Sequence, residues 1–347
     1  MAGEIYDVIV VGAGNAGLTA ALAARQQATR VLLLDKCPKA VRGGNTRFSG
    51  GGFRFTYNSL DDMRPMLPDL ADEEAAKMED GTYTNAEFFE DVMQVTEYAA
   101  DKKLTNILVD QSYATARWLT EMNVKWILST STHAIKMGQK IKFPPGRVIS
   151  VNDGGLGLVE MLFPAAETKG IEIIYDARAN GLIFDKAGGV AGVRAQTREG
   201  LVDFEGRAVV LAAGRFEANP EMRARYLGAG WDLVKVRGSR YNSGEVLNLA
   251  LAFGAQPVGH WSGCHAVLVD AQAPDVECAY EHRYSYPYGI MVDINGKRFV
   301  DEGEDFFTYT YAKCGREVLR LPWRTAYQIF DSKMRSLLRP EYNRGFH

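Results

Sequence analysis

Short apolar runs and helical patterns alternate along much of the chain. Residues 6–11 (YDVIVV), 30–36 (RVLLLDK) and 171–175 (IEIIY) are apolar runs of strand-forming residues, typical of strands buried on both faces of a sheet. Residues 18–26 (LTAALAARQ) follow the first run and place leucine and alanine on one helical face. This order of strand, helix and strand predicts an α/β fold with a Rossmann-like, mainly parallel sheet.

A glycine-rich turn joins the first predicted strand to the first predicted helix. Gly12, Gly14 and Gly17 have G-x-G-x-x-G spacing, in which the first glycine permits a tight turn, the second lets backbone approach a pyrophosphate, and the third allows close packing of helix on strand. Asp35 ends the second strand 18 residues after Gly17, near the position of the acid that hydrogen-bonds an adenosine ribose. Together these features predict a dinucleotide site.

A second glycine-rich segment follows Asp35. Residues 36–53 (KCPKAVRGGNTRFSGGGF) contain five glycines with Asn, Thr and Ser among them, where a nicotinamide enzyme would soon enter its next helix. Backbone N–H groups and hydroxyls here could contact a flat polar group. A flexible surface loop is the alternative, and the Asn-Thr and Ser insertions favour the binding site over it.

The middle and the end of the chain differ from its start in amino-acid composition. Residues 57–123 are rich in acids and helix formers, which predicts a helical excursion. After about residue 258 histidines, aromatics and cysteines replace the Ala/Gly/Val pattern, so a first domain over 1–258 and a second over 259–347 are expected. The apolar positions of the helical excursion that we expect to face the core are Phe88, Val92, Val95, Tyr98, Ala99, Tyr113, Ala116 and Leu119.

Three blocks of the sequence resemble the FAD-binding flavoproteins of the fumarate reductase/succinate dehydrogenase type. The first is the glycine-rich amino end; the second, residues 188–222, is a hairpin-like stretch leading to a turn at Ala213-Gly214. The third, residues 241–267 with 289–303, looks most like the tricarballylate dehydrogenase branch, which shares its fold with a cobalamin-pathway flavoprotein. The resemblance covers essentially the whole chain. It implies an FAD-binding domain of the GR2 type and an α+β capping domain.

The resemblance also implies how FAD would be held. It assigns the ADP half to the first glycine-rich turn and Asp35, the pyrophosphate and ribityl region to residues 43–46, the isoalloxazine to residues 49–51, and the adenine side to Ala213-Gly214. Covalently flavinylated members carry a histidine where this chain has Gly44, so non-covalent FAD is expected. The expected cofactor residues are Gly12, Gly14, Asn15, Ala16, Gly17, Asp35, Lys36, Gly43, Gly44, Asn45, Thr46, Ser49, Gly50, Gly51, Ala213 and Gly214.

The resemblance further implies hydride transfer between flavin N5 and a carbon next to a carboxylate of a small polycarboxylate. His265 matches the family's substrate histidine, with His260 as a rival. Arginine is suited to binding carboxylates because its forked guanidinium donates two parallel hydrogen bonds. Arg283 is the candidate for the proton-handling arginine, although an ungapped alignment puts Ser285 at that position. Arg298 is expected to be structural, tied to nearby acids at 301 or 302.

Composition narrows the class of protein. The formal net charge is −3 and there is no long run of one sign, which argues against a nucleic-acid or membrane-surface protein. No apolar stretch reaches the roughly 20 residues of a membrane helix, and Met1–Asp7 shows no signal peptide. The four cysteines are scattered, which predicts free thiols and no metal or cluster site. We therefore expect a cytoplasmic protein. The sequence names no electron acceptor.

The chain ends inside the expected capping domain. Family members continue and return to the FAD domain, so the sequence predicts a carboxy-terminally truncated chain. Two alternatives to a dehydrogenase or reductase stay open: a non-catalytic flavin-binding remnant or subunit, and a flavin oxygenase of the cobalamin-pathway kind.

Overall fold

A mixed sheet with strand order β7-β2-β1-β10-β9-β8 lies at the centre of the first part of the computed structural model, which describes residues 5–79, 81–130, 134–146, 148–278, 283–305 and 307–338. The strands β1 (Tyr6–Val11), β2 (Val31–Leu34) and β7 (Glu172–Ile174) pair in parallel. Each falls inside one of the three predicted strands, so the predicted parallel α/β sheet is confirmed.

The other half of the sheet is antiparallel. The long strand β10 (Gly200–Leu211) pairs in parallel with β1 through residues 206–211 and antiparallel with β9 (Val190–Thr197) through residues 200–205. The strand β8 (Arg178–Phe184) completes it beside β9. The predicted hairpin before the Ala213-Gly214 turn is therefore present, and β10 joins both halves of the sheet.

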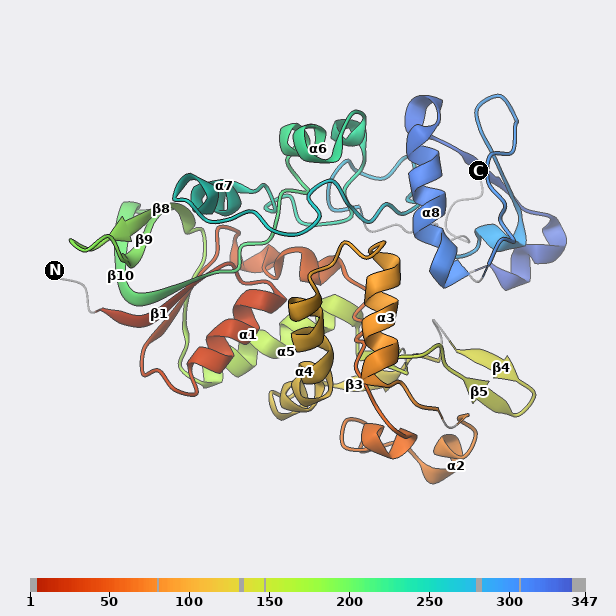
Figure 1. The fold of residues 1–347 in the computed structure, drawn as a ribbon, viewed down its shortest axis with the longest axis horizontal. Coiled ribbons are helices and arrows are strands. Elements are labelled where there is room, and N and C mark those ends of the chain that lie inside the picture. Colours follow the sequence, from red (N-terminus) through yellow and green to blue (C-terminus); the bar gives the residue numbers. More distant parts are fainter. Residues whose placement is uncertain are drawn as a thin grey trace. The chain divides into compact units, whose positions relative to one another are not determined.

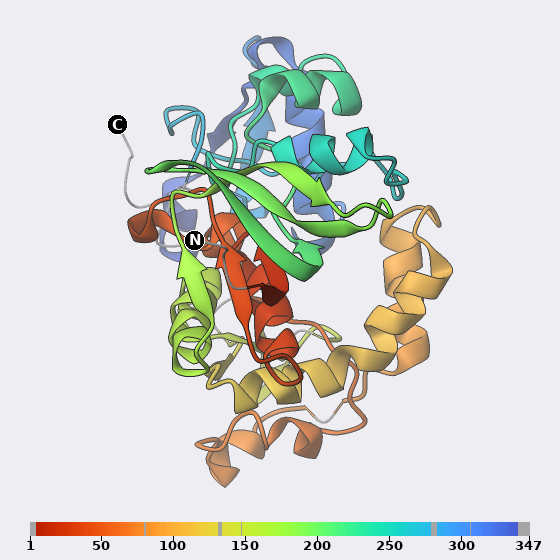
Figure 2. The same cartoon turned by 90° about the vertical axis from the view of Figure 1, so that its left-hand side faces the viewer.

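Alternate residues of the parallel strands enter two different cores, as the two-residue period of a strand requires. Val10 and Leu33 face a core that they share with helices α1 (Asn15–Ala24) and α5 (Gly154–Thr168). Ile9 faces a second core on the opposite side of the sheet. Figures 1 and 2 show α1 and α5 side by side along the first of these faces.

The predicted helical excursion is present, with one correction. Helix α3 (Asn85–Val95) begins at a capping box formed by Thr84 and Glu87. It ends ten residues later, earlier than the sequence predicts, because the chain turns through left-handed backbone at Glu97 and Tyr98. Val95, the last residue of α3, is 80% exposed, and beyond the helix end Tyr98 is 63% exposed and Ala99 is exposed as well, so the prediction that these three residues face the core is wrong.

The second helix of the excursion, α4 (Lys102–Glu121), starts at Asp101, whose carboxylate accepts a hydrogen bond from the Leu104 N–H. It buries Ala116 and Leu119 as predicted. The remaining elements of this part of the chain are α2 (Asp72–Ala75), α7 (Glu245–Ala252), the strand pair β3 (Trp126–Leu128) and β6 (Ile149–Val151), and the strand pair β4 (Ile135–Met137) and β5 (Lys140–Lys142).

The chain divides into two units, Met1–Arg215 with Gly244–His260 and Phe216–Ser243 with Trp261–His347. The expected division at residue 258 differs from this one in the segment 216–243, which groups with the second unit. One reason is the bridge between Val236 and Val276, and another is the ion pair between Arg240 and Glu277. Both tie this early segment to residues far along the chain.

The second unit contains helices α6 (Pro220–Leu227) and α8 (Phe307–Arg320) and the antiparallel strands β11 (Ile290–Val292) and β12 (Tyr327–Ile329). The Asn219 side chain caps the start of helix α6 and Pro220 follows it, and the helix ends at Gly228, which has a φ of +105°. The small hydrophobic core of the second unit is built on Tyr286 and Met291.

Two other predictions, one for this unit and one for the whole chain, are confirmed. Arg298 pairs with the buried Glu302, which also accepts the Met291 N–H, so Arg298 is structural. The four cysteines are free thiols. Among the described residues, no helix is both long and apolar enough to cross a membrane.

Candidate functional site

The first and third glycines of the amino-terminal turn are required by packing. Gly12 has a φ of +104°, and a Cβ there would lie 2.5 Å from the Ala212 carbonyl oxygen at the end of β10. A Cβ on Gly17 would lie 1.7 Å from the Gly12 carbonyl oxygen. Both positions therefore hold α1 against the sheet, whatever the turn binds.

Gly14 is different because the fold does not need a glycine there. Its φ of −78° and ψ of −174° suit any L-residue. A Cβ would lie 3.5 Å from Thr46 Oγ1 and 3.7 Å from the Gly43 carbonyl oxygen, which are ordinary contacts. The missing side chain leaves bare backbone at the amino end of α1, which carries no side-chain cap and no acid in its first turn. Such a helix end attracts an anion.

The second glycine-rich segment lies against this turn and against α5. Thr46 Oγ1 accepts the Asn15 N–H at 2.9 Å. A Cβ on Gly51 would lie 2.5 Å from Gly154 Cα, and one on Gly155 would lie 1.8 Å from the Thr46 carbonyl oxygen. Sequence reasoning missed Gly154 and Gly155, although the NDGG run at the start of α5 was the available signal.

A buried polar atom also supports a ligand site at the amino end of α1 beside Gly14, which we call the cradle. Among the described residues, Asn15 Oδ1 has no hydrogen-bond partner although it is buried. A buried acceptor without a donor is costly, and it fits a site whose donor arrives with the ligand. The amino end of α1, where the bare Gly14 N-cap offers no side-chain cap, and this acceptor together fit the diphosphate and sugar of a dinucleotide.

Asp35 is buried at the carboxyl end of β2. Its two carboxylate oxygens accept the N–H groups of Ala13 and Cys37, each at 3.2 Å. Burial raises the pKa of Asp35, while these two hydrogen bonds and the charge of Lys36 act in the opposite direction. The carboxylate keeps further lone pairs that could accept sugar hydroxyls.

Replacing Asp35 with alanine is expected to weaken FAD binding roughly 10- to 150-fold, because charge-assisted hydrogen bonds are worth about 1.5–3 kcal/mol. The apo-protein should also lose stability, since the Ala13 and Cys37 N–H groups lose their acceptor. Flavin fluorescence titration and urea unfolding measure the two effects. Asp203→Ala, which breaks an exposed ion pair with Arg194, is the control. Undiminished FAD affinity in Asp35→Ala, with only the stability lowered, would leave Asp35 a purely structural role.

The other expected cofactor residues are placed as follows. The Lys36 amine lies 2.8 Å from Glu245 Oε2, at the start of α7. Ala213 lies beside Gly12, since a Cβ on Gly12 would be 2.6 Å from Ala213 Cα. A Cβ on Gly50 would meet nothing within 4 Å, so this glycine borders open space. Left-handed backbone is found at Gly43, Gly44 and Gly214.

The expected catalytic residues fall into different units. His260 is exposed and belongs to the first unit, whereas His265 and Arg283 belong to the second. The His265 ring packs edge-on against Tyr311, with 5.2 Å between ring centroids. Arg283 is buried, and its guanidinium lies over the rings of Tyr284 at 4.5 Å and Tyr311 at 5.7 Å. The structure thus brings His265 and Arg283 to the same aromatic ring.

His265 is exposed on the second unit, yet its environment favours the neutral imidazole. Desolvation by neighbouring atoms, followed by the positive charges of Arg283 and Arg237, lowers the pKa of His265. Neutral imidazole still donates one N–H, so the group can hydrogen-bond a carboxylate oxygen.

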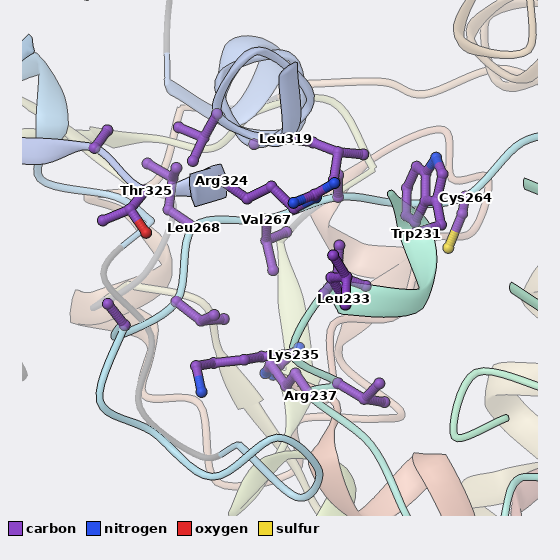
Figure 3. A pocket seen from close by; sticks show the side chains of 18 of the residues that line it. Trp231, Leu233, Lys235, Arg237, Cys264, Val267, Leu268, Leu319, Arg324 and Thr325 are labelled. Atoms are coloured by element: carbon purple, nitrogen blue, oxygen red, sulfur yellow. The ribbon is translucent and has the colours of Figure 1, made fainter. Parts of the chain in front are cut away.

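The second unit also contains a cavity of about 460 Å³, which has His265 in its wall. Most of the other lining residues come from 231–237, from 264–271, and from the end of α8 with the segment that follows it. Figure 3 shows the side chains that surround it. Its basic and apolar lining residues were not singled out from the sequence, because they come together only in the folded unit.

The fold and the cradle define a dinucleotide-binding α/β protein. The chain belongs to the FAD binding domain family, which matches residues 7–324. The predicted family of FAD flavoproteins, which includes fumarate reductases, is therefore confirmed, and so is FAD as its cofactor.

Relatives with curated names agree with this assignment. Probable fumarate reductase Ifc3 from Shewanella frigidimarina is 26% identical over 333 residues, covering 95% of this chain and 51% of the relative. Urocanate reductase from Eggerthella lenta is 31% identical over 224 residues, covering 63% of this chain and 33% of the relative. The chain thus spans about half the length of these relatives, or less.

Among solved structures, the open conformation of a flavocytochrome c3 fumarate reductase superimposes with a TM-score of 0.73 and 25% identity. The match covers 97% of this chain and 54% of that one. The likeness therefore extends over both units of the chain.

Proposed function

We propose that this chain forms the FAD-binding and substrate-binding parts of an oxidoreductase that acts on a CH–CH or C=C bond of a small carboxylate. The observation that carries the proposal is the bare Gly14 at the start of α1, which leaves open a space that a side chain would fill. Curated relatives named as fumarate reductase and urocanate reductase support the reaction class.

When bound, FAD supplies the two-electron chemistry. The chain's own residues would divide the remaining tasks. The amino end of α1, Asn15 and Asp35 would hold the cofactor non-covalently. His265 would donate a hydrogen bond to a substrate carboxylate from its neutral imidazole, and Arg283 would handle the proton that accompanies hydride transfer.

The position of Arg283 supports this role. Two aromatic rings hold its guanidinium in place, and stacking of this kind favours arginine over lysine. Its charge also lowers the pKa of His265, so the two groups act on one another. A small polycarboxylate such as tricarballylate or succinate remains our proposal for the substrate, and the cytoplasm our proposal for the location.

The test begins with purified protein and added FAD. We expect a yellow protein that releases flavin on heating. Anaerobic addition of tricarballylate or succinate should then bleach the flavin absorbance. A protein that stays colourless with FAD present would contradict the proposal and support a remnant without cofactor. A yellow protein that no saturated polycarboxylate bleaches would reject the dehydrogenase direction for this substrate class.

Arg283→Lys is expected to keep FAD bound while lowering turnover by about a hundredfold or more, the usual scale for a proton-transfer group. Steady-state turnover, flavin content and thermal midpoint are measured together. His265→Asn and His260→Asn are compared in the same assay, because only the histidine that binds substrate should raise KM. Full turnover in Arg283→Lys would reject the proton-handling assignment.

A further inference from the structure

The cavity of the second unit has chemistry that the proposed flavin reaction does not explain. Its walls include the apolar side chains of Leu233, Val267, Leu268 and Leu319 together with the Trp231 indole. A volume of about 460 Å³ lies within the range of ligand pockets, roughly 300–1,000 Å³. A dicarboxylate of four carbons would fill only a fraction of it.

Basic residues outnumber acidic residues in the lining of the cavity. Four basic residues, Arg223, Lys235, Arg237 and Arg324, and one acidic residue, Glu217, line the cavity.

Two of these cations already have partners. The Arg223 guanidinium donates to four backbone carbonyls, at 217, 231, 232 and 234, and so holds the loop together. The Lys235 amine donates to the Ala273 carbonyl and pairs with Asp275.

Arg324 is placed differently. Its Nε donates to the Gly230 carbonyl at 3.2 Å, and among the described residues no carboxylate forms an ion pair with it. A Cβ on Gly230 would lie 2.9 Å from Arg324 Nη2, so the guanidinium lies directly on the bare backbone of this glycine. Figure 3 shows the side chain reaching across the cavity, with its nitrogens directed toward the side where Trp231 and Cys264 lie.

The backbone that presents Arg324 is strained. Trp323 has a φ of 61° and Arg324 a φ of 52°, which places two consecutive non-glycine residues in the left-handed region. Each such residue costs on the order of 1 kcal/mol or more. Strain of this kind persists where the surrounding structure demands it, and here it directs a cation into a cavity that has both apolar and charged walls.

From this geometry we propose that the cavity binds a ligand with one anionic group on an apolar body, such as an aryl- or branched alkyl-carboxylate, and that Arg324 anchors the anion. The apolar walls receive the body of the ligand. The site lies within the second unit, and binding there needs neither flavin nor turnover. Because His265, the proposed substrate histidine, lies in the wall of the same cavity, the inference deepens the proposed function, and binding measured without turnover separates a failure of the inference from a failure of that function.

The probe is 3-phenylpropanoate, added to the FAD-treated full chain and followed by calorimetry and by the fluorescence of Trp231 and Trp323, which both line the cavity. Its neutral amide and succinate are the comparison ligands. We expect saturable binding of the acid and at least tenfold weaker binding of both comparison ligands, because charge-assisted hydrogen bonds and apolar burial are each needed.

Two variants and one control locate the binding. Arg324→Met should weaken binding of the acid about tenfold or more while leaving the amide unchanged. Val267→Phe fills the cavity without changing charge and should abolish binding. Arg320→Met, an exposed arginine on α8 paired with Glu317, should bind like the wild type. Equal affinity for acid and amide, wild-type affinity in Arg324→Met or Val267→Phe, or no binding at all would each overturn the proposal.

Discussion

Replacing Gly14 with alanine is expected to leave the apo-protein folded and to weaken FAD binding by about 1–3 kcal/mol, roughly 5- to 150-fold in Kd. The backbone conformation at Gly14 suits alanine, and the new methyl group would make only ordinary contacts with Thr46 and Gly43. The same methyl group would occupy the space through which a diphosphate approaches the amino end of α1. Gly14→Val, with a bulkier side chain, should abolish FAD retention.

The measurement pairs flavin content after gel filtration with thermal unfolding of the apo-protein. Gly81→Ala is the matched control, because a Cβ at Gly81 meets nothing within 4 Å and Gly81 is far in sequence from the glycine-rich turn at residues 12–17. A Gly14→Val protein that retains stoichiometric FAD would show that the cradle is not the diphosphate site. A Gly14→Ala apo-protein that fails to fold would show that the glycine is structural.

Gly17→Ala, in contrast to Gly14→Ala, is expected to lower the stability of the apo-protein. Its methyl group would lie 1.7 Å from the Gly12 carbonyl oxygen, an overlap that α1 can relieve only by moving away from β1. Overpacking costs about 3 kcal/mol at the upper end of its usual range. For a unit of this size that corresponds to a fall of roughly 6–12 °C in Tm.

Thermal unfolding of apo Gly17→Ala, followed by far-ultraviolet circular dichroism, checks this result against apo Gly14→Ala. The comparison separates two glycines three positions apart in one motif. Equal Tm values for the two variants would contradict the packing described for Gly17.

The sequence predicted the parallel part of the sheet well because buried strands there read as continuous apolar runs. Val10 and Leu33 enter one core and Ile9 the other, so both faces of these strands carry apolar residues. The glycine motif was equally readable, because the sequence spacing assigned a turn to Gly12 and close packing to Gly17, and the structure shows steric demands at both. Only the structure shows that the fold places no such demand on Gly14.

Other features depended on contacts that no local pattern encodes. Val95 and Tyr98 continue a helical period, but left-handed backbone ends α3 before the second of them. The segment 216–243 reads like the first domain, yet it pairs with residues near 276. Arg324 and Gly230 are 94 residues apart, and their contact appears only in the folded unit.

The long strand β10 has a consequence for how the protein is made. Its partner β1 lies 200 residues earlier, as the pairing of Tyr6 with Gly206 shows. At about 5–20 residues per second, a ribosome needs roughly 10–40 s between the synthesis of these two strands. Until β10 emerges, β1 has one unpaired edge and the glycine turn lacks the backbone that fixes Gly12. The nascent chain therefore exposes an apolar strand edge for that period, and chaperones that shield such edges during translation should raise its yield.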